Sequence, residues 1–151
     1  GLYNRVRATY RDALIFCALY SCVMWGILML ASQQVSLWFS LDPAGNDVLY
    51  AFTHFGAGGF ILIGALMVSN AAFNALGKPL WSTFTNWLRD GVLTLPAGIW
   101  LTGMFGATGV IYAQTLVGAA VGLIAALWGW IYVSKLGSAQ ASQLNLTKPP
   151  A

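Results

Sequence analysis

Four uncharged polar side chains stand inside long apolar stretches of this sequence, where such groups are costly to hold. They are His54, Asn70, Asn74 and Gln114. An imidazole or an amide in such a place can bind a polar group of a ligand, or it can link two helices by a hydrogen bond. We therefore take these residues as candidates for the wall of a substrate pathway, with helix–helix hydrogen bonding as the alternative for Asn70 and Gln114.

The chemistry-bearing residues do not form a catalytic or metal-binding pattern. One histidine and four acidic residues are too sparse for a hydrolytic triad, and no His, Cys and carboxylate set has metal-ligand spacing. Cys17 and Cys22 lie in an apolar stretch on different helix faces, where thiols act as small apolar groups. We expect no enzyme, no resident metal or cofactor, and, at a net charge of +3, no nucleic-acid partner.

The small amount of charge indicates which solvent surrounds the chain. Of its 151 residues, 58% are hydrophobic and 7% are charged, whereas a soluble domain carries about 25% charged residues. Seven Lys and Arg with four Asp and Glu cannot cover the surface of a soluble globule of this size. We infer that the lipid bilayer is the main partner of this chain.

Three stretches, residues 13–41, 48–77 and 91–134, contain no charged side chain. A spanning helix needs about 20 mostly apolar residues, and the third stretch, too long for one span, is broken by the glycine-rich segment 103–109. The pattern predicts an all-α polytopic membrane protein with four transmembrane helices within residues 1–136. The expected ranges are 12–33, 47–76, 80–101 and 108–133, followed by a disordered cytoplasmic tail over 137–151.

The basic residues predict the orientation. They precede the first helix, lie in the second connection and follow the fourth helix: Arg5, Arg7, Arg11, Lys78, Lys135 and Lys148. The first connection carries only acidic charge, and the third carries none. By the positive-inside rule we expect a multi-pass protein of the inner (plasma) membrane with both termini of this chain in the cytoplasm.

Gly77, Lys78 and Pro79 are typical of a turn between the second and third helices. Glycine suits a left-handed helix end, proline suits the first turn of a helix, and lysine anchors the turn at the water boundary. Pro96, inside the third helix, is expected to kink it because proline removes a backbone hydrogen bond.

Arg89 and Asp90 interrupt the third helix about two turns from its start. Because they are adjacent in sequence, we do not expect them to face each other on a helix, and Arg89 is expected to extend toward the cytoplasmic water.

Small residues recur every four positions on the fourth helix, at Gly118, Gly122 and Ala126. This spacing lets two helix backbones approach closely and predicts tight packing within a bundle. A bending point that moves during transport is the alternative.

The segment NAAFNALGKPLWSTFTNWLRDGVLTLP resembles the multidrug and toxic compound extrusion (MATE) family of transporters. The shared pattern is Asn-Ala, an aromatic residue, Gly-Lys-Pro, an arginine and a proline. Here these are Asn70, Ala71, Phe73, Gly77, Lys78, Pro79, Arg89 and Pro96. The segments GLYNRVRATYRDAL and SLDPAGNDVLYAF also resemble the family, so the likeness extends from Gly1 to about Leu136.

The resemblance implies a twelve-helix protein of two six-helix lobes, in which this chain would form helices nine to twelve. It implies a secondary antiporter that exports small amphipathic, often cationic compounds in exchange for Na⁺ or H⁺ by alternating access. The chain begins with Gly rather than Met, and we expect its partner to be the N-terminal helices of the same protein.

Some family members bind the coupling cation through an acidic residue in helix ten. The matching segment GGFILIGALMVSN has none, so we expect that cation site outside this chain.

Two other functions remain open from the sequence. One is a four-helix membrane anchor or assembly module that transports nothing, and the other is a lipid-linked flippase of the same superfamily. Eight further helices encoded upstream would favour the antiporter over the anchor, and a flippase would require a more basic cavity than these helices supply.

Overall fold

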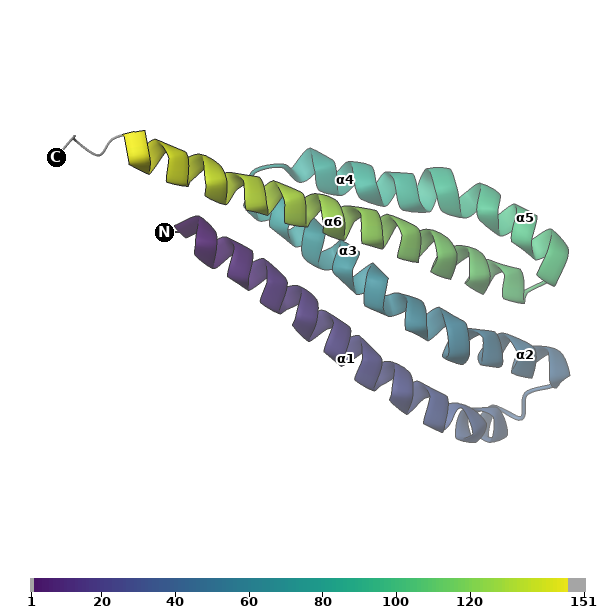
Figure 1. The fold of residues 1–151 in the computed structure, drawn as a ribbon. Coiled ribbons are helices and arrows are strands. Elements are labelled where there is room, and N and C mark those ends of the chain that lie inside the picture. The colour runs from purple at the N-terminus through teal and green to yellow at the C-terminus, as the bar shows by residue number, and fades with distance from the viewer. Residues whose placement is uncertain (1, 147–151) are drawn as a thin grey trace.

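The computed structural model describes residues 2–146 as four antiparallel helical rods, with no strand among them (Figure 1). Two of the rods contain a short π-helical segment, in which the backbone hydrogen bonds span five residues instead of four. In chain order the elements are α1 (Leu2–Phe39), α2 (Pro43–Ala51), η1 (Phe52–Gly56), α3 (Ala57–Ala75), α4 (Pro79–Trp87), η2 (Leu88–Thr94), α5 (Leu95–Phe105) and α6 (Thr108–Leu146).

Among the described residues, three helices are long and apolar enough to cross a membrane, namely Arg5–Phe39, Pro43–Ala75 and Thr108–Leu136. The chain is therefore all-helical with the character of a membrane protein, as its composition predicts. The rod formed by α4, η2 and α5 is not among the three, although at 1.5 Å per residue it is about 40 Å long. It holds the two charges of Arg89 and Asp90 near its middle.

The rods are longer than the sequence pattern predicts. The first begins at Leu2, well before residue 12, so the charge-rich segment 5–12 is part of the helix, because a helix continues from apolar into polar residues without a new nucleation step. The second begins at Pro43, where the Asp42 carboxylate accepts a hydrogen bond of 2.8 Å from the Gly45 backbone N–H.

The C-terminal tail differs from the expectation over part of its length. Residues 137–146 continue α6 as far as Leu146, where a disordered segment was expected. Each residue added to an existing helix gains a backbone hydrogen bond without a new nucleation step, and this stretch is free of proline. Residues 147–151 lie outside the described part of the chain.

The turn between α3 and α4 has the expected form. Gly77 adopts a left-handed conformation with φ of 73°, and the Lys78 backbone N–H donates to the Phe73 carbonyl over 2.8 Å. Pro79 then occupies the first turn of α4, where its missing N–H is not needed. The turn between α5 and α6 also uses a glycine with positive φ, Gly106, at φ 62° and ψ −142°.

The centre of the bundle is the contact between α3 and α6, where the predicted small residues lie. A Cβ atom added to Gly118 would come within 2.8 Å of the Ile63 side chain, and one added to Gly122 would collide with the Leu62 backbone carbonyl. At the next position of the series, the Ala126 carbonyl accepts a hydrogen bond of 3.2 Å from the Tyr10 hydroxyl of α1. Close backbone approach therefore joins α3 to α6, and a side-chain hydrogen bond links α1 to α6.

Aromatic side chains fill the bundle at the end that contains the α3–α4 turn. Trp81 of α4 stacks on Trp128 of α6 with ring centroids 4.6 Å apart, and Phe73 packs against both rings. The start of α1 and the second half of α6 lie at the same end (Figure 1). We call it the basic end, after the residues it carries: Arg5, Arg7, Arg11, Lys78 and Lys135.

We predict that Gly122→Ala lowers the stability of the bundle by about 1–3 kcal/mol, because the new methyl group meets backbone atoms that cannot rotate away. The measurement is a denaturation midpoint followed by circular dichroism of the purified protein. Gly26→Ala is the control, since nothing lies within 4 Å of the added atom and alanine favours a helix. Equal midpoints for the two variants would contradict the close contact of α3 and α6.

Candidate functional site

A cavity of about 240 Å³ lies midway along the bundle, between η1, α3, η2 and α6. We call it the mid-helix cavity. Its apolar wall consists of Phe52, Phe60, Ile63, Met67 and Ile111. Its polar lining consists of Arg89, Asp90, Thr94, Gln114 and Thr115. Apolar walls with a few convergent polar groups are typical of small-molecule sites.

Arg89 and Asp90 form a bidentate ion pair on this cavity, contrary to the expectation that neighbouring residues point apart. The Arg89 Nε atom is 2.7 Å from Asp90 Oδ1, and Nη2 is 2.9 Å from Oδ2. The pairing does not depend on π-helical geometry, because Arg11 and Asp12 pair over 2.9 Å in regular α1. The long, flexible arginine chain can curl back along the helix to reach the adjacent carboxylate.

The two members of this pair are buried to different extents. The Arg89 side chain is 17% exposed, whereas the Asp90 side chain is 61% exposed. Arg89 therefore does not extend to the water boundary as expected but stays within the bundle, with two of its N–H groups on the carboxylate. Asp90 is therefore the more accessible member of the pair.

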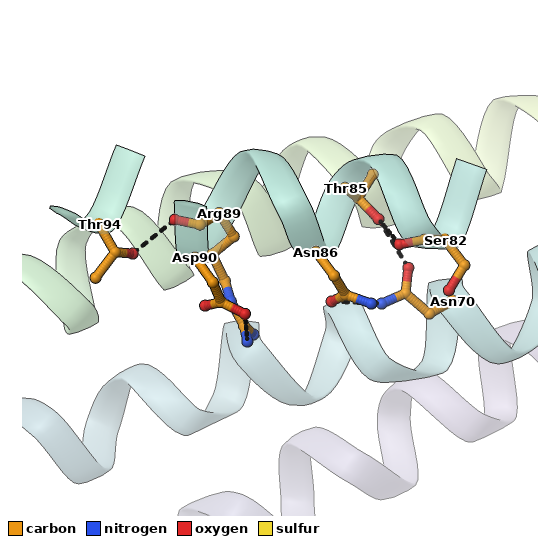
Figure 2. A network of polar contacts seen from close by, with 7 residues as sticks. All are labelled: Asn70, Ser82, Thr85, Asn86, Arg89, Asp90 and Thr94. Atoms are coloured by element: carbon orange, nitrogen blue, oxygen red, sulfur yellow. Dashed lines mark hydrogen bonds and ion pairs between the residues drawn. The ribbon is translucent and has the colours of Figure 1, made fainter. Parts of the chain in front are cut away.

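The π-helical segment η2 places this pair. It ends at Thr94, immediately before Pro96 in the first turn of α5, so the irregular backbone precedes the proline that was expected to kink the rod. The Thr94 hydroxyl donates to the Arg89 carbonyl over 2.7 Å. A side chain of the cavity lining thus satisfies a carbonyl in the irregular turn (Figure 2).

The other π-helical segment, η1, borders the same cavity through Phe52 and Gly56. Trp25 of α1 donates its Nε1–H to the Thr53 carbonyl over 2.8 Å, which satisfies a backbone group of this segment. His54 lies beyond the cavity lining, where it stacks on Tyr50 with ring centroids 3.9 Å apart. π-bulges occur often at functional sites, and here both face one cavity.

Asn70 lies outside the mid-helix cavity, in a hydrogen-bonded link between α3 and α4 (Figure 2). Its Nδ2 atom donates to Asn86 Oδ1 over 3.1 Å, and its Oδ1 atom accepts from the Thr85 hydroxyl over 2.9 Å. The residue is only 5% exposed. This is the helix–helix alternative that the sequence left open.

Of the four polar candidates, only Gln114 lines the mid-helix cavity. Asn74 lies exposed near the end of α3, one turn after Asn70. The motif residues Gly77, Lys78 and Pro79 form the turn at the basic end, and the Lys78 ammonium lies 5.8 Å from the Trp81 ring centroid. They are separated from η2 by α4 and do not line the cavity.

Sequence reasoning did not assign Asp90, Thr94, Phe52 or Phe60 to the site. For Asp90 a signal existed, because a carboxylate eleven residues after the start of an apolar rod is costly and needs a reason. The two phenylalanines carried no signal, since aromatic residues are common throughout this chain.

No family model, curated protein or solved structure matches this chain. No group of three or more His, Cys, Asp and Glu side chains that could hold a metal ion occurs among the described residues. The mid-helix cavity and its ion pair are therefore the features from which a function can be argued.

We predict that Asn70→Ala lowers stability by about 1 kcal/mol, the size of a hydrogen bond between helices in a membrane, because both ends of its amide are bonded. A graded detergent denaturation of the purified protein measures this. The matched control is Asn74→Ala, the same change one turn away at an exposed position. A midpoint shifted equally in both variants would argue against the link to α4.

Proposed function

We propose that this chain forms the last four spanning helices of a secondary antiporter that resembles the MATE family and exports small amphipathic cations. The observation that carries the proposal is the Arg89–Asp90 pair on the mid-helix cavity. Charged residues within membrane helices are rare, face the bundle interior, and typically mark substrate or ion pathways.

The depth of the pair supports this proposal. Arg89 follows Pro79 by ten residues, which is about 15 Å along the rod, or half of a hydrocarbon core about 30 Å thick. A charge at that depth costs roughly 2.5–3.5 kcal/mol on insertion scales. Mutual neutralisation of Arg89 and Asp90 reduces that cost and favours a third rod that crosses the bilayer like the others.

The lining of the cavity suits an amphipathic cation. Phe52 and Phe60 pack edge to face with ring centroids 6.0 Å apart, and their rings can contact the apolar part of such a ligand. A carboxylate has about four acceptor positions, and Arg89 engages one on each oxygen of Asp90. A ligand cation can therefore bind Asp90 without first removing the arginine.

The four-span arrangement predicts which connections face which side of the membrane. Single cysteines at positions 45 and 107, in a background without Cys17 and Cys22, should react with a membrane-impermeant maleimide added to intact cells. A cysteine at position 78 should react only after the membrane is opened, because the basic end faces the cytoplasm. If the cysteine at position 107 did not react with the maleimide on intact cells, the rod of α4, η2 and α5 would not cross the membrane.

We predict that Asp90→Asn slows ethidium export by about tenfold or more in cells that express the complete gene product, since a charge-assisted bond is worth about 1.5–3 kcal/mol. The readout is the initial efflux rate at matched protein level. Asp47→Asn is the control, because Asp47 lies outside the mid-helix cavity. Wild-type export by Asp90→Asn would place the substrate elsewhere, and no export by the wild type would favour the anchor or assembly module.

The lipid-linked flippase is less well supported by the same cavity. Recognition of a pyrophosphate would need several basic groups that can reach the ligand. The mid-helix cavity contains one, Arg89, and two of its donors are occupied by Asp90.

A further inference from the structure

A second recess lies between α1 and α3 at the basic end and has a volume of about 560 Å³. We call it the α1–α3 groove. Three alanines of α3, Ala71, Ala72 and Ala75, form its floor, and their small side chains leave the space open. Arg5 and Thr9, one helical turn apart on α1, stand along its edge.

The groove combines an apolar floor with a positively charged edge. Arg5 is exposed, and four more basic residues of the described chain belong to the basic end: Arg7, Arg11, Lys78 and Lys135. The carboxylate nearest in sequence, Asp12, is paired with Arg11 over 2.9 Å. Arg7 lies over the Trp130 ring at 4.8 Å from its centroid. Arg5 is therefore the cation best placed to meet a ligand in the groove.

We propose that the α1–α3 groove binds an anionic phospholipid, with one acyl chain along the alanine floor and the phosphate against Arg5. Both α1 and α3 belong to helices apolar enough to lie in a bilayer, so acyl chains are the solvent that reaches this groove. Basic pockets between membrane helices bind anionic headgroups, and the Thr9 hydroxyl adds a donor beside Arg5.

This site is independent of the antiporter proposal. It uses α1 and α3 at the basic end, whereas the mid-helix cavity lies between η1, α3, η2 and α6. A protein that transported nothing could still bind lipid there, and loss of lipid binding would leave the argument about Asp90 unchanged.

The test uses the purified protein in phosphatidylcholine nanodiscs that contain a trace of spin-labelled lipid. Electron paramagnetic resonance separates lipid held on the protein from free lipid. We expect labelled phosphatidylglycerol to bind about fivefold better than labelled phosphatidylcholine, the factor that one basic residue near the membrane surface contributes. Arg5→Gln should remove this preference, and Arg11→Gln, whose partner is Asp12, should keep it.

A second pair of variants tests the floor of the groove. Ala72→Leu should reduce the held phosphatidylglycerol by filling the space, whereas Ala120→Leu, an equal change at an exposed position of α6, should not. Equal binding of the two lipids by the wild type would overturn the proposal, because another helix or a nonselective lipid would then occupy the groove. Equal losses in Arg5→Gln and Arg11→Gln would also overturn it, in favour of diffuse surface charge.

Discussion

The close approach of α3 and α6 at Gly118 and Gly122 is the contact on which the other features depend. In a bilayer the hydrophobic effect does not drive helices together, so dispersion contacts and hydrogen bonds must do so, and both require backbones at short range. Ile63 lies against Gly118 and also forms part of the apolar wall of the mid-helix cavity. A side chain on either glycine would move α3 outward and change the shape of that wall.

The two π-helical segments show how irregular backbone is tolerated inside this tight bundle. Backbone groups within an apolar surrounding need partners, and both segments obtain them from side chains. Trp25 donates to the Thr53 carbonyl in η1, and Thr94 donates to the Arg89 carbonyl in η2. Both irregular turns border one cavity, so the backbone departs from regular α-helix where polar or aromatic side chains line the space.

The architecture follows from local signals that the sequence displays. Charge-free stretches predict the rods, Gly77 and Pro79 predict the turn between α3 and α4, and the spacing of Gly118 and Gly122 predicts close packing. These features depend on backbone preferences and on the composition of single helices, so no knowledge of neighbouring helices is needed.

The site could not be predicted in the same way. Whether Asn70 faces a pathway or another helix depends on the register between α3 and α4, which brings Asn86 within hydrogen-bond reach. Whether Arg89 extends along the rod or curls back to Asp90 depends on its side-chain conformation, which has no sequence pattern. The extension of α6 to Leu146 has no signal in the polar composition of residues 137–146, because it depends on propagation of a helix that is already formed.

The charges of this chain are arranged so that the mid-helix cavity and the α1–α3 groove favour opposite ligands. At the basic end, Arg5 is exposed and the nearby Asp12 carboxylate is paired with Arg11, so the α1–α3 groove presents positive charge at its edge. In the mid-helix cavity the order is reversed. Arg89 is largely buried, whereas the side chain of Asp90 is 61% exposed. If both proposals hold, the same fold attracts lipid anions at its edge and drug-like cations at its centre. The reason is that the exposed charge is positive at the groove, on Arg5, and negative at the cavity, on Asp90.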